Sequence, residues 1–429
     1  MASSADSHAL GGDHSDHGSS HIAAWKWGLV WLLFLATMIN YMDRQTMQVT
    51  STHLIREFFD GKERGYGQVE SAFQYAFAAA QIVAGFLIDR FSVRWFYVGA
   101  LLVWSGAGVM TGLVSTIEAL LFCRIILGAA EAFNWPCAVT VVRRVLPLEA
   151  RSLANGIFHS GASIGAAVTP ILAWSMVSPD GENWRSLFVI VGSIGALWAV
   201  LWFFIIRGPR AVAIETPAPT MPREPVDKPP FAGVLASRLF WITMTVSLTV
   251  NVCWHFFRTW LPRILKRDLG YSEEEMLWMV AGFFVAADIG SLLAGYATRR
   301  LTRAGVSVER SRKLVSTSTS LLCLLAIPIA FQPTPFLSVI LVLIVAAGAM
   351  GGFANMFALA QETSVWHTAK VVGLAGSLPW AVLAFLNPLI GGLADQSGSF
   401  SQAVIVVAFV PLAGALVGWW WPERKTRPS

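Results

Sequence analysis

Apolar stretches of about twenty residues recur along the whole 429-residue chain and alternate with short polar connections. As an α-helix, each stretch is long enough to cross about 30 Å of hydrocarbon. Hydrophobic residues make up 55% of the chain and charged residues only 13%, a balance outside that of soluble globular domains. The pattern therefore predicts an all-α membrane protein with twelve transmembrane helices, at residues 25–47, 67–88, 95–114, 118–142, 152–176, 184–206, 239–261, 275–298, 314–332, 336–358, 370–393 and 400–421.

A polar, proline-rich stretch interrupts this pattern and divides the spans six and six. The two halves correspond weakly, because Gly156 stands fourteen residues before Pro170 and Gly373 stands fourteen before Asn387-Pro388. Repeats of this kind are typical of transporters whose halves move against each other around a site between them. We therefore expect a cytoplasmic tail at 1–24, six-helix bundles at 25–206 and 239–421, a cytoplasmic linker at 207–238 and a second tail at 422–429.

The basic residues indicate which ends of the spans face the cytoplasm. Of the 31 Lys and Arg residues, 21 fall at one set of ends, with the loops and tails that adjoin them, and seven fall at the other. The positive-inside rule then places both termini in the cytoplasm of a multi-pass protein of the cell (inner) membrane. The same distribution explains the formal net charge of +5, so no nucleic-acid partner is expected.

The first tail and the cysteines supply no further functional motif. The tail lacks the apolar core of a signal peptide, so we expect it to be disordered. Its histidines are too loosely spaced to predict a metal site. The cysteines fall inside predicted spans without a paired motif, so no disulfide is expected; they are Cys123, Cys137, Cys253 and Cys323.

Ionisable side chains inside the spans are the strongest functional candidates, because a charge in the membrane needs a cavity or a partner. Arg124 and Glu131 are seven residues apart, which places both on one helix face, about 10 Å apart along the axis. Asn251, His255 and Arg258 follow an i, i+4, i+7 pattern and form a second polar stripe. The six candidates are Asp43 and Arg44 in the first span, Arg124 and Glu131 in the fourth, Arg258 in the seventh and Asp288 in the eighth.

Structural explanations stay open for each of these pairs. The first-span pair also fits a place at the membrane interface, with its arginine reaching the headgroups. The fourth-span pair also fits a static ion pair that braces two helices. Arg258, with Asp288 as its candidate counter-charge, fits a structural pair as well as a binding role in a second-half cavity that includes His255.

Several motifs resemble the major facilitator superfamily and, within it, the anion:cation symporter family. The stretch from Gly85 to Arg94 resembles the loop signature of the superfamily. Asn40-Tyr41-Met42-Asp43-Arg44 and the segment from Arg124 to Pro136 are similar to those of the family's hexuronate and aldonate permeases. The resemblance covers nearly the whole chain and extends to Ala286-Ala287-Asp288-Ile289-Gly290 in the second half.

This resemblance implies a major facilitator fold and a symporter that imports a small organic anion, such as a hexuronate or aldonate, together with protons. It implies that Asp43 and Glu131 handle the proton and that Arg44 binds the substrate carboxylate. Arg124 would pair with Glu131 and be released when that acid is protonated. Further candidates for substrate binding are Arg124, Tyr41, Gln74, Tyr75, Asn134, Ser377, Trp380 and Asn387.

Two residues depart from the family's pattern. Ser92 stands where the loop signature has glycine, which bears on the neighbouring Asp89 and Arg90, the pair expected to act as a gate between helices. His159 stands where the family has an amide, which leaves the polarity of the fifth span open.

The charges themselves suggest how transport could be coupled to protons. Three acids and three arginines balance within the spans, so an entering anion leaves the site negative unless an acid takes up a proton. Arg44 offers a planar fork that matches a carboxylate. An exchanger or facilitator of organic anions or sugar phosphates, and a sodium-coupled symporter, are the alternatives.

Other classes of protein fit the sequence less well. No metal-ligand cluster, nucleophile motif or glycine-rich phosphate loop occurs, so we expect neither an enzyme nor a cofactor. The linker is too short to hold the signalling domain of a sensor. We expect a monomer in the lipid bilayer.

Overall fold

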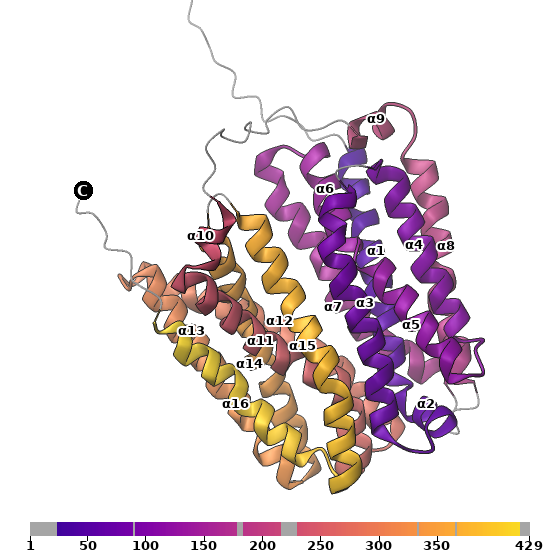
Figure 1. Ribbon diagram of the computed structural model, residues 1–429, viewed down its shortest axis with the longest axis vertical. Coiled ribbons are helices and arrows are strands. Elements are labelled where there is room, and N and C mark those ends of the chain that lie inside the picture. The colour runs from indigo at the N-terminus through magenta and orange to yellow at the C-terminus, as the bar shows by residue number, and fades with distance from the viewer. Residues whose placement is uncertain are drawn as a thin grey trace, which may run out of the picture.

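The computed structural model describes residues 24–88, 91–177, 183–215, 230–332, 334–364 and 367–420. Within these ranges the secondary structure is helical (Figure 1). The first half comprises α1 (Ala24–Val49), α2 (Ser51–Phe58), α3 (Glu63–Ile88), α4 (Val93–Thr111), α5 (Ile117–Glu131), α6 (Asn134–Val145), α7 (Leu148–Met176), α8 (Trp184–Ile205) and α9 (Pro209–Glu215). The second half comprises α10 (Phe231–Leu235), α11 (Arg238–Arg263), the π-helix η1 (Ile264–Asp268), α12 (Glu273–Arg303), α13 (Val308–Cys323), the 3₁₀ turns η2 (Leu324–Ala326) and η3 (Pro328–Phe331), α14 (Pro335–Glu362), α15 (Thr368–Ser397) and α16 (Ser401–Gly418).

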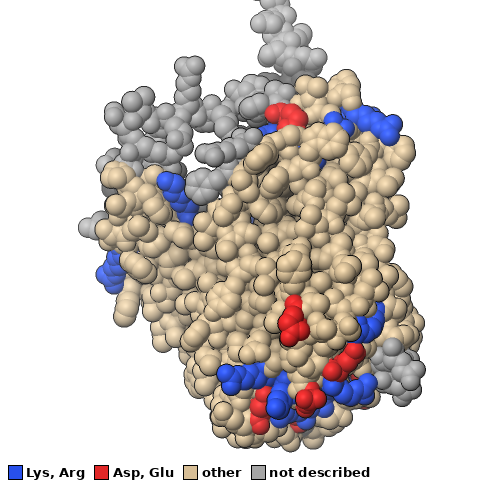
Figure 2. All heavy atoms as spheres, turned by 45° about the vertical axis from the view of Figure 1, so that its right-hand side comes forward, with Lys and Arg blue, Asp and Glu red and all other residues tan. Residues whose placement is uncertain are grey.

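The helices confirm the all-α membrane fold expected from the sequence. Ten helical segments of the described chain are long and apolar enough to cross a membrane. The other two expected spans correspond to α1 and α3, which are each 26 residues long. Figure 2 shows a broad band of surface almost without charged side chains between the two ends of the molecule.

The fourth expected span is two helices rather than one. The helix α5 ends at Glu131 and α6 begins at Asn134. Pro136 has no N–H to donate to the carbonyl of Ala132, so a continuous helix would lose that hydrogen bond. The break therefore ends α5 at Glu131, one of the candidate residues.

Local capping fixes where other helices begin. Ser272 accepts a hydrogen bond from the backbone N–H of Glu275, and the Glu275 carboxylate accepts one from the backbone N–H of Ser272. This capping box satisfies two free donors at the start of α12. Thr116 and Ser237 accept similar bonds at the starts of α5 and α11.

Two groups of helices lie side by side (Figure 1). Most helices pack within their own group, which is α1 to α8 or α11 to α16. The groups meet where α3 and α15 pack most extensively on each other and where α7 packs on α12. One buried apolar cluster draws on both groups, and the rings of Tyr66 and Trp260 in it lie 5.5 Å apart. Of the predicted linker, α9 and α10 are described and 216–229 lies outside the described residues. The bundle boundaries therefore stay a prediction.

Ion pairs and hydrogen bonds join the two groups at the end of the molecule where α2 lies, which we call the α2 end. Arg263 donates from its Nε to both carboxylate oxygens of Glu63, at 3.0 Å each. His53 lies 3.0 Å from Glu273 of α12. Asp395 of α15 accepts hydrogen bonds from the first backbone N–H groups of α3, at 2.9 and 3.0 Å. Charged groups of the first half thus meet partners of the second half at this end.

The contact between α3 and α15 depends on glycine. A methyl group on Gly391 would lie 2.5 Å from the backbone oxygen of Glu63. One on Gly67 would lie 2.5 Å from the backbone oxygen of Asn387. Backbones can approach this closely only where a side chain is missing, as is common between membrane helices.

Replacing Gly391 with alanine is expected to lower the unfolding temperature, because the methyl group meets the backbone of α3. A cost of about 1–3 kcal/mol is expected for such overpacking. Gly373, in the same helix, is the matched control, since a methyl group there meets no atom within 4 Å. Gly373→Ala should leave the unfolding temperature unchanged or raise it, because alanine favours a helix by about 0.5–1 kcal/mol. Thermal unfolding in detergent measures both, and equal shifts would contradict the close contact.

Candidate functional site

Six charged side chains gather in the interior of the molecule and form what we call the charge cluster. Each is at most 4% exposed, and each interacts electrostatically with other members. Three carboxylates and three guanidinium groups balance within it. The members are Asp43 and Arg44 on α1, Glu70 on α3, Arg124 and Glu131 on α5, and Arg258 on α11.

Arg44 and Glu131 form the direct ion pair of the cluster. The Nε of Arg44 donates to Glu131 at 2.5 Å, and the two side chains are 3% and 0% exposed. The sequence predicted that Glu131 pairs with Arg124, and the structure corrects this. Arg124 stands seven residues earlier, about 10 Å away along the helix axis, whereas Arg44 reaches Glu131 from α1.

Several polar atoms of the cluster lack a hydrogen-bond partner among the described residues. They include Nη2 of Arg44, Oε1 of Glu131, Oδ2 of Asp43, and Nε and Nη2 of Arg124. All are buried. Buried polar groups in proteins are nearly always hydrogen-bonded, so a set of unsatisfied groups in one place indicates a site for water, protons or a polar ligand.

Aromatic rings surround the guanidinium group of Arg44. Its carbon lies 4.5 Å from the ring centroid of Phe77, 5.2 Å from those of Tyr41 and Phe73, and 5.3 Å from that of Trp380. Cation–π attraction of this kind helps to hold a cation away from water. The structure thus brings the predicted Tyr41 and Trp380 to Arg44, whereas Phe73 and Phe77 look like ordinary apolar residues in the sequence.

Trp380 connects the two groups of helices at the cluster. It belongs to α15, and its ring lies over Arg44 of α1 and near Arg258 of α11, whose guanidinium carbon is 5.4 Å from the ring centroid. The ring of His255 lies 4.3 Å from that of Trp380. The polar stripe predicted on the seventh span therefore faces the cluster through His255 and Arg258.

Glu70 is a cluster member that the sequence pattern did not single out. The hydroxyl of Tyr66 donates to it at 3.2 Å, and it interacts electrostatically with Arg258 and Arg124. It lies near the start of the predicted second span, where a carboxylate also fits the membrane interface. The available signal was spacing, because Tyr66, Glu70 and Gln74 recur every four residues along one face.

Asp288 was expected to be the counter-charge of Arg258, and this expectation is wrong. Ser163 of α7 donates to Asp288 at 2.6 Å, and Asp288 also interacts electrostatically with His159. The reason is that α12 packs on α7, so Asp288 meets that helix. The carboxylates that act electrostatically on Arg258 are Glu70 and Glu131.

Two asparagines that were predicted to bind substrate form hydrogen bonds with other side chains of the protein. Asn387 donates to Gln74 at 3.0 Å and accepts a hydrogen bond from the indole of Trp260 at 3.1 Å, which ties α3, α15 and α11 together. Asn134 accepts a hydrogen bond from Tyr97 at 2.7 Å and donates to Thr37 at 3.2 Å, all within the first half. These contacts hold helices in register, and a substrate role for either amide stays a prediction.

The remaining candidates lie apart from the cluster or outside the described residues. Tyr75 is 49% exposed, on the same face of α3 as the exposed Ile82. Ser377 donates to the backbone of its own helix at Gly373. The expected gate residues, Asp89 and Arg90, lie outside the described residues.

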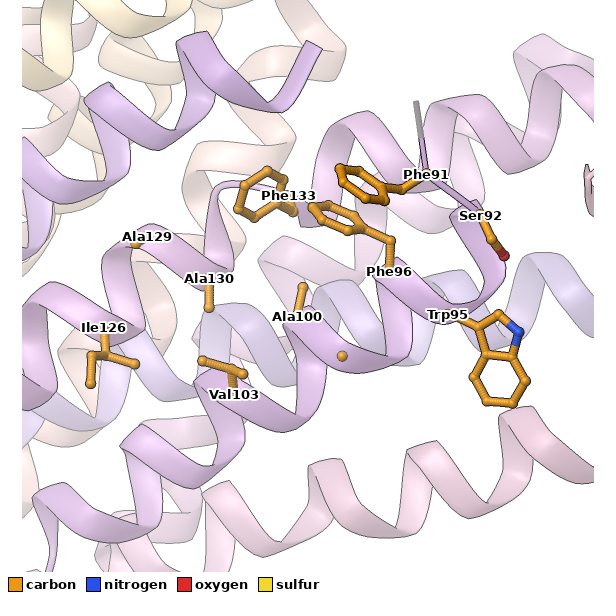
Figure 3. Close-up of a pocket in the computed structure, with 11 residues that line it drawn as sticks. Phe91, Ser92, Trp95, Phe96, Ala100, Val103, Ile126, Ala129, Ala130 and Phe133 are labelled. Atoms are coloured by element: carbon orange, nitrogen blue, oxygen red, sulfur yellow. The ribbon is translucent and has the colours of Figure 1, made fainter. Parts of the chain in front are cut away.

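An apolar groove of about 700 Å³ lies elsewhere, between the start of α4 and the end of α5, with Phe133 just beyond α5 (Figure 3). Its lining is Phe91, Ser92, Trp95, Phe96, Gly99, Ala100, Val103, Ile126, Ala129, Ala130 and Phe133. None of these residues belongs to the charge cluster. The polar site and this apolar groove are therefore separate.

Residues 33–378 match the model of the Major Facilitator Superfamily, which is most of the chain. The chain belongs to the major facilitator superfamily. Two solved structures of similar fold are a bacterial homologue of the human lysosomal transporter Spinster, inward-facing and occupied, and a D-xylose-proton symporter. Their TM-scores are 0.74 and 0.73, at 17% and 14% identity. The matches cover 92% and 93% of this chain and 97% and 98% of those chains.

Curated relatives of this superfamily member match over nearly their whole length. The D-galactonate transporter of Escherichia coli O6:H1 (strain CFT073) is 28% identical, over 90% of this chain and 93% of the relative. The hexuronate transporter of Escherichia coli K12 is 26% identical, over 93% and 94%. A probable galactarate/D-glucarate transporter of Bacillus subtilis is 25% identical, over 91% and 90%.

Removing one partner of the buried ion pair should cost far more stability than removing one partner of an ion pair nearer the surface. Arg44→Met leaves the Glu131 carboxylate buried without a partner, which costs about 3–5 kcal/mol in comparable cases. Arg312 and Glu362 form the control pair, at 2.6 Å with side chains 17% and 31% exposed. Arg312→Met should cost about 0–1 kcal/mol.

Thermal unfolding in detergent compares the two substitutions. Adding Glu131→Gln to Arg44→Met should recover part of the loss, because the unpaired charge is then removed. Equal losses for Arg44→Met and Arg312→Met would contradict a tightly coupled buried pair.

Proposed function

We propose that this protein is a proton-coupled symporter that moves a sugar acid across the cell membrane by alternating access. The observation that carries the proposal is the buried Arg44–Glu131 ion pair, set in a neutral cluster with unsatisfied polar atoms. The names of its relatives support the substrate class, since they are transporters of D-galactonate, hexuronate and galactarate or D-glucarate.

Protonation of Glu131 would release Arg44 for the substrate. With both side chains charged, Arg44 is engaged by Glu131 and an incoming carboxylate is repelled by it. A proton on Glu131 removes that charge and leaves the Arg44 fork free to bind a carboxylate. Because such linkage is reciprocal, a bound anion also favours the proton. Asp43, which interacts electrostatically with Glu131, Arg124 and Arg44, is the second proton site in this proposal.

The places where the two groups of helices are joined support alternating access. With both termini in the cytoplasm, the α2 end faces outward, and its ion pairs close the site from that side. Rocking of the 25–206 and 239–421 bundles about the α3–α15 and α7–α12 contacts would break these pairs and admit substrate.

Uptake by purified protein in liposomes tests the proposal. With the inside neutral, the outside acidic and the membrane potential clamped, labelled D-galactonate or D-glucuronate should accumulate, and a protonophore should abolish the accumulation. Uptake indifferent to the pH gradient would contradict proton coupling. Uptake that needs substrate preloaded inside would indicate an exchanger, and uptake that follows a sodium gradient would indicate sodium coupling.

Glu131→Gln should abolish accumulation driven by the pH gradient while retaining exchange of labelled for unlabelled substrate. Glutamine keeps the shape of the side chain but cannot carry the proton, so substrate and proton are no longer linked. Glu118→Gln is the matched control, because Glu118 lies exposed in the first turn of the same helix. Full accumulation by Glu131→Gln would remove this residue from the proton role.

A further inference from the structure

Two arginines from opposite groups of helices share one tryptophan. The guanidinium carbons of Arg44 and Arg258 lie 5.3 and 5.4 Å from the ring centroid of Trp380. The two carbons are therefore no farther apart than the sum of those distances. Both arginines are at most 4% exposed, so the interior holds two fixed cations within reach of one small molecule.

Arg258 has no hydrogen-bond partner among the described residues that would neutralise it. Its Nε is buried and unsatisfied. Its guanidinium group is attracted electrostatically by the Glu70 carboxylate and repelled by the Arg44 guanidinium group. Glu70 in turn receives its hydrogen bond from Tyr66. Burying a cation without a directly bonded anion is costly, so this position favours an added carboxylate.

We propose that the substrate carries two acid groups, of which Arg44 binds one and Arg258 the other. This rests on the proposed transport of sugar acids and narrows it to six-carbon diacids, the aldarates, in preference to aldonates and hexuronates. Such a molecule joins its two carboxyl carbons by five bonds of about 1.5 Å each, which is long enough to engage both guanidinium groups across the Trp380 ring.

The acids of the cluster fit this assignment. Glu131 bonds to Arg44, and both Glu131 and Glu70 interact electrostatically with the two arginines, so two carboxylates already neutralise them. A diacid would replace both. The Nδ1 of His255 is buried, unsatisfied and close to Trp380, and it can bond a hydroxyl group of the chain between the two carboxylates.

Binding of galactarate and D-galactonate to the purified wild-type protein tests the proposal without any substitution. The two molecules have the same carbon chain and hydroxyl groups except at the last carbon, which is a carboxylate in one and an alcohol in the other. Galactarate should bind about tenfold more tightly or better. Equal or weaker binding of galactarate would overturn the proposal.

Substitution of Arg258 tests whether this residue causes the preference for galactarate over galactonate. Arg258→Gln should reduce the ratio of galactarate to galactonate affinity about tenfold, and Arg258→Lys should restore part of it. Arg300→Gln, on the exposed last turn of α12, is the matched control and should leave the ratio unchanged. An equal loss for both substrates in Arg258→Gln would assign Arg258 a structural role and overturn the proposal.

These outcomes are distinguishable from failure of the proposed function. Galactonate transport driven by the pH gradient, without galactarate binding, would overturn this inference and leave sugar-acid symport standing. Failure to transport any sugar acid would overturn the proposed function itself. If Arg258→Gln does not fold, the relative affinities of the wild-type protein and of Arg258→Lys for galactarate and galactonate still test the proposal.

Discussion

The cost of placing charge inside a membrane is the constraint on which the rest of this structure depends. The six side chains of the charge cluster lie almost completely buried, which is tolerable because three carboxylates face three guanidinium groups. Arg44 and Glu131 make the direct bond, and aromatic rings enclose the arginine. A neutral cluster of this kind cannot accept an anion without a compensating change. In the proposed function, that requirement would link binding of an anion to uptake of a proton.

The same constraint explains where the cluster lies. Its members come from α1, α3 and α5 of the first half and from α11 of the second, so it lies where the two groups of helices meet. Glycine brings the backbones of α3 and α15 together nearby, and ion pairs join the groups at the α2 end. A relative movement of the groups would change the surroundings of every charge at once.

The sequence was sufficient for the fold because apolar length is a strong constraint in a membrane, where each helix satisfies its own backbone. It also located five of the six cluster residues, since charges stand out in apolar spans. It did not predict the partners of Glu131 and Asp288. Those partners depend on how the helices pack against one another and not on spacing along one helix. Glu70 was missed because a carboxylate near the end of a span is ambiguous.

If Arg44 and Arg258 bind the substrate as proposed, their distribution would connect recognition to movement. Arg44 is fixed to the first group of helices, whereas Arg258 and Trp380 are fixed to the second. A ligand with one acid group could bind the arginine of only one group of helices, whereas a ligand with two could bind the arginines of both groups. A ligand shifts a conformational equilibrium only by its difference in affinity between the states. A diacid that spans the two groups gains its second contact only when they are close, so the feature that selects the substrate would also drive closure around it.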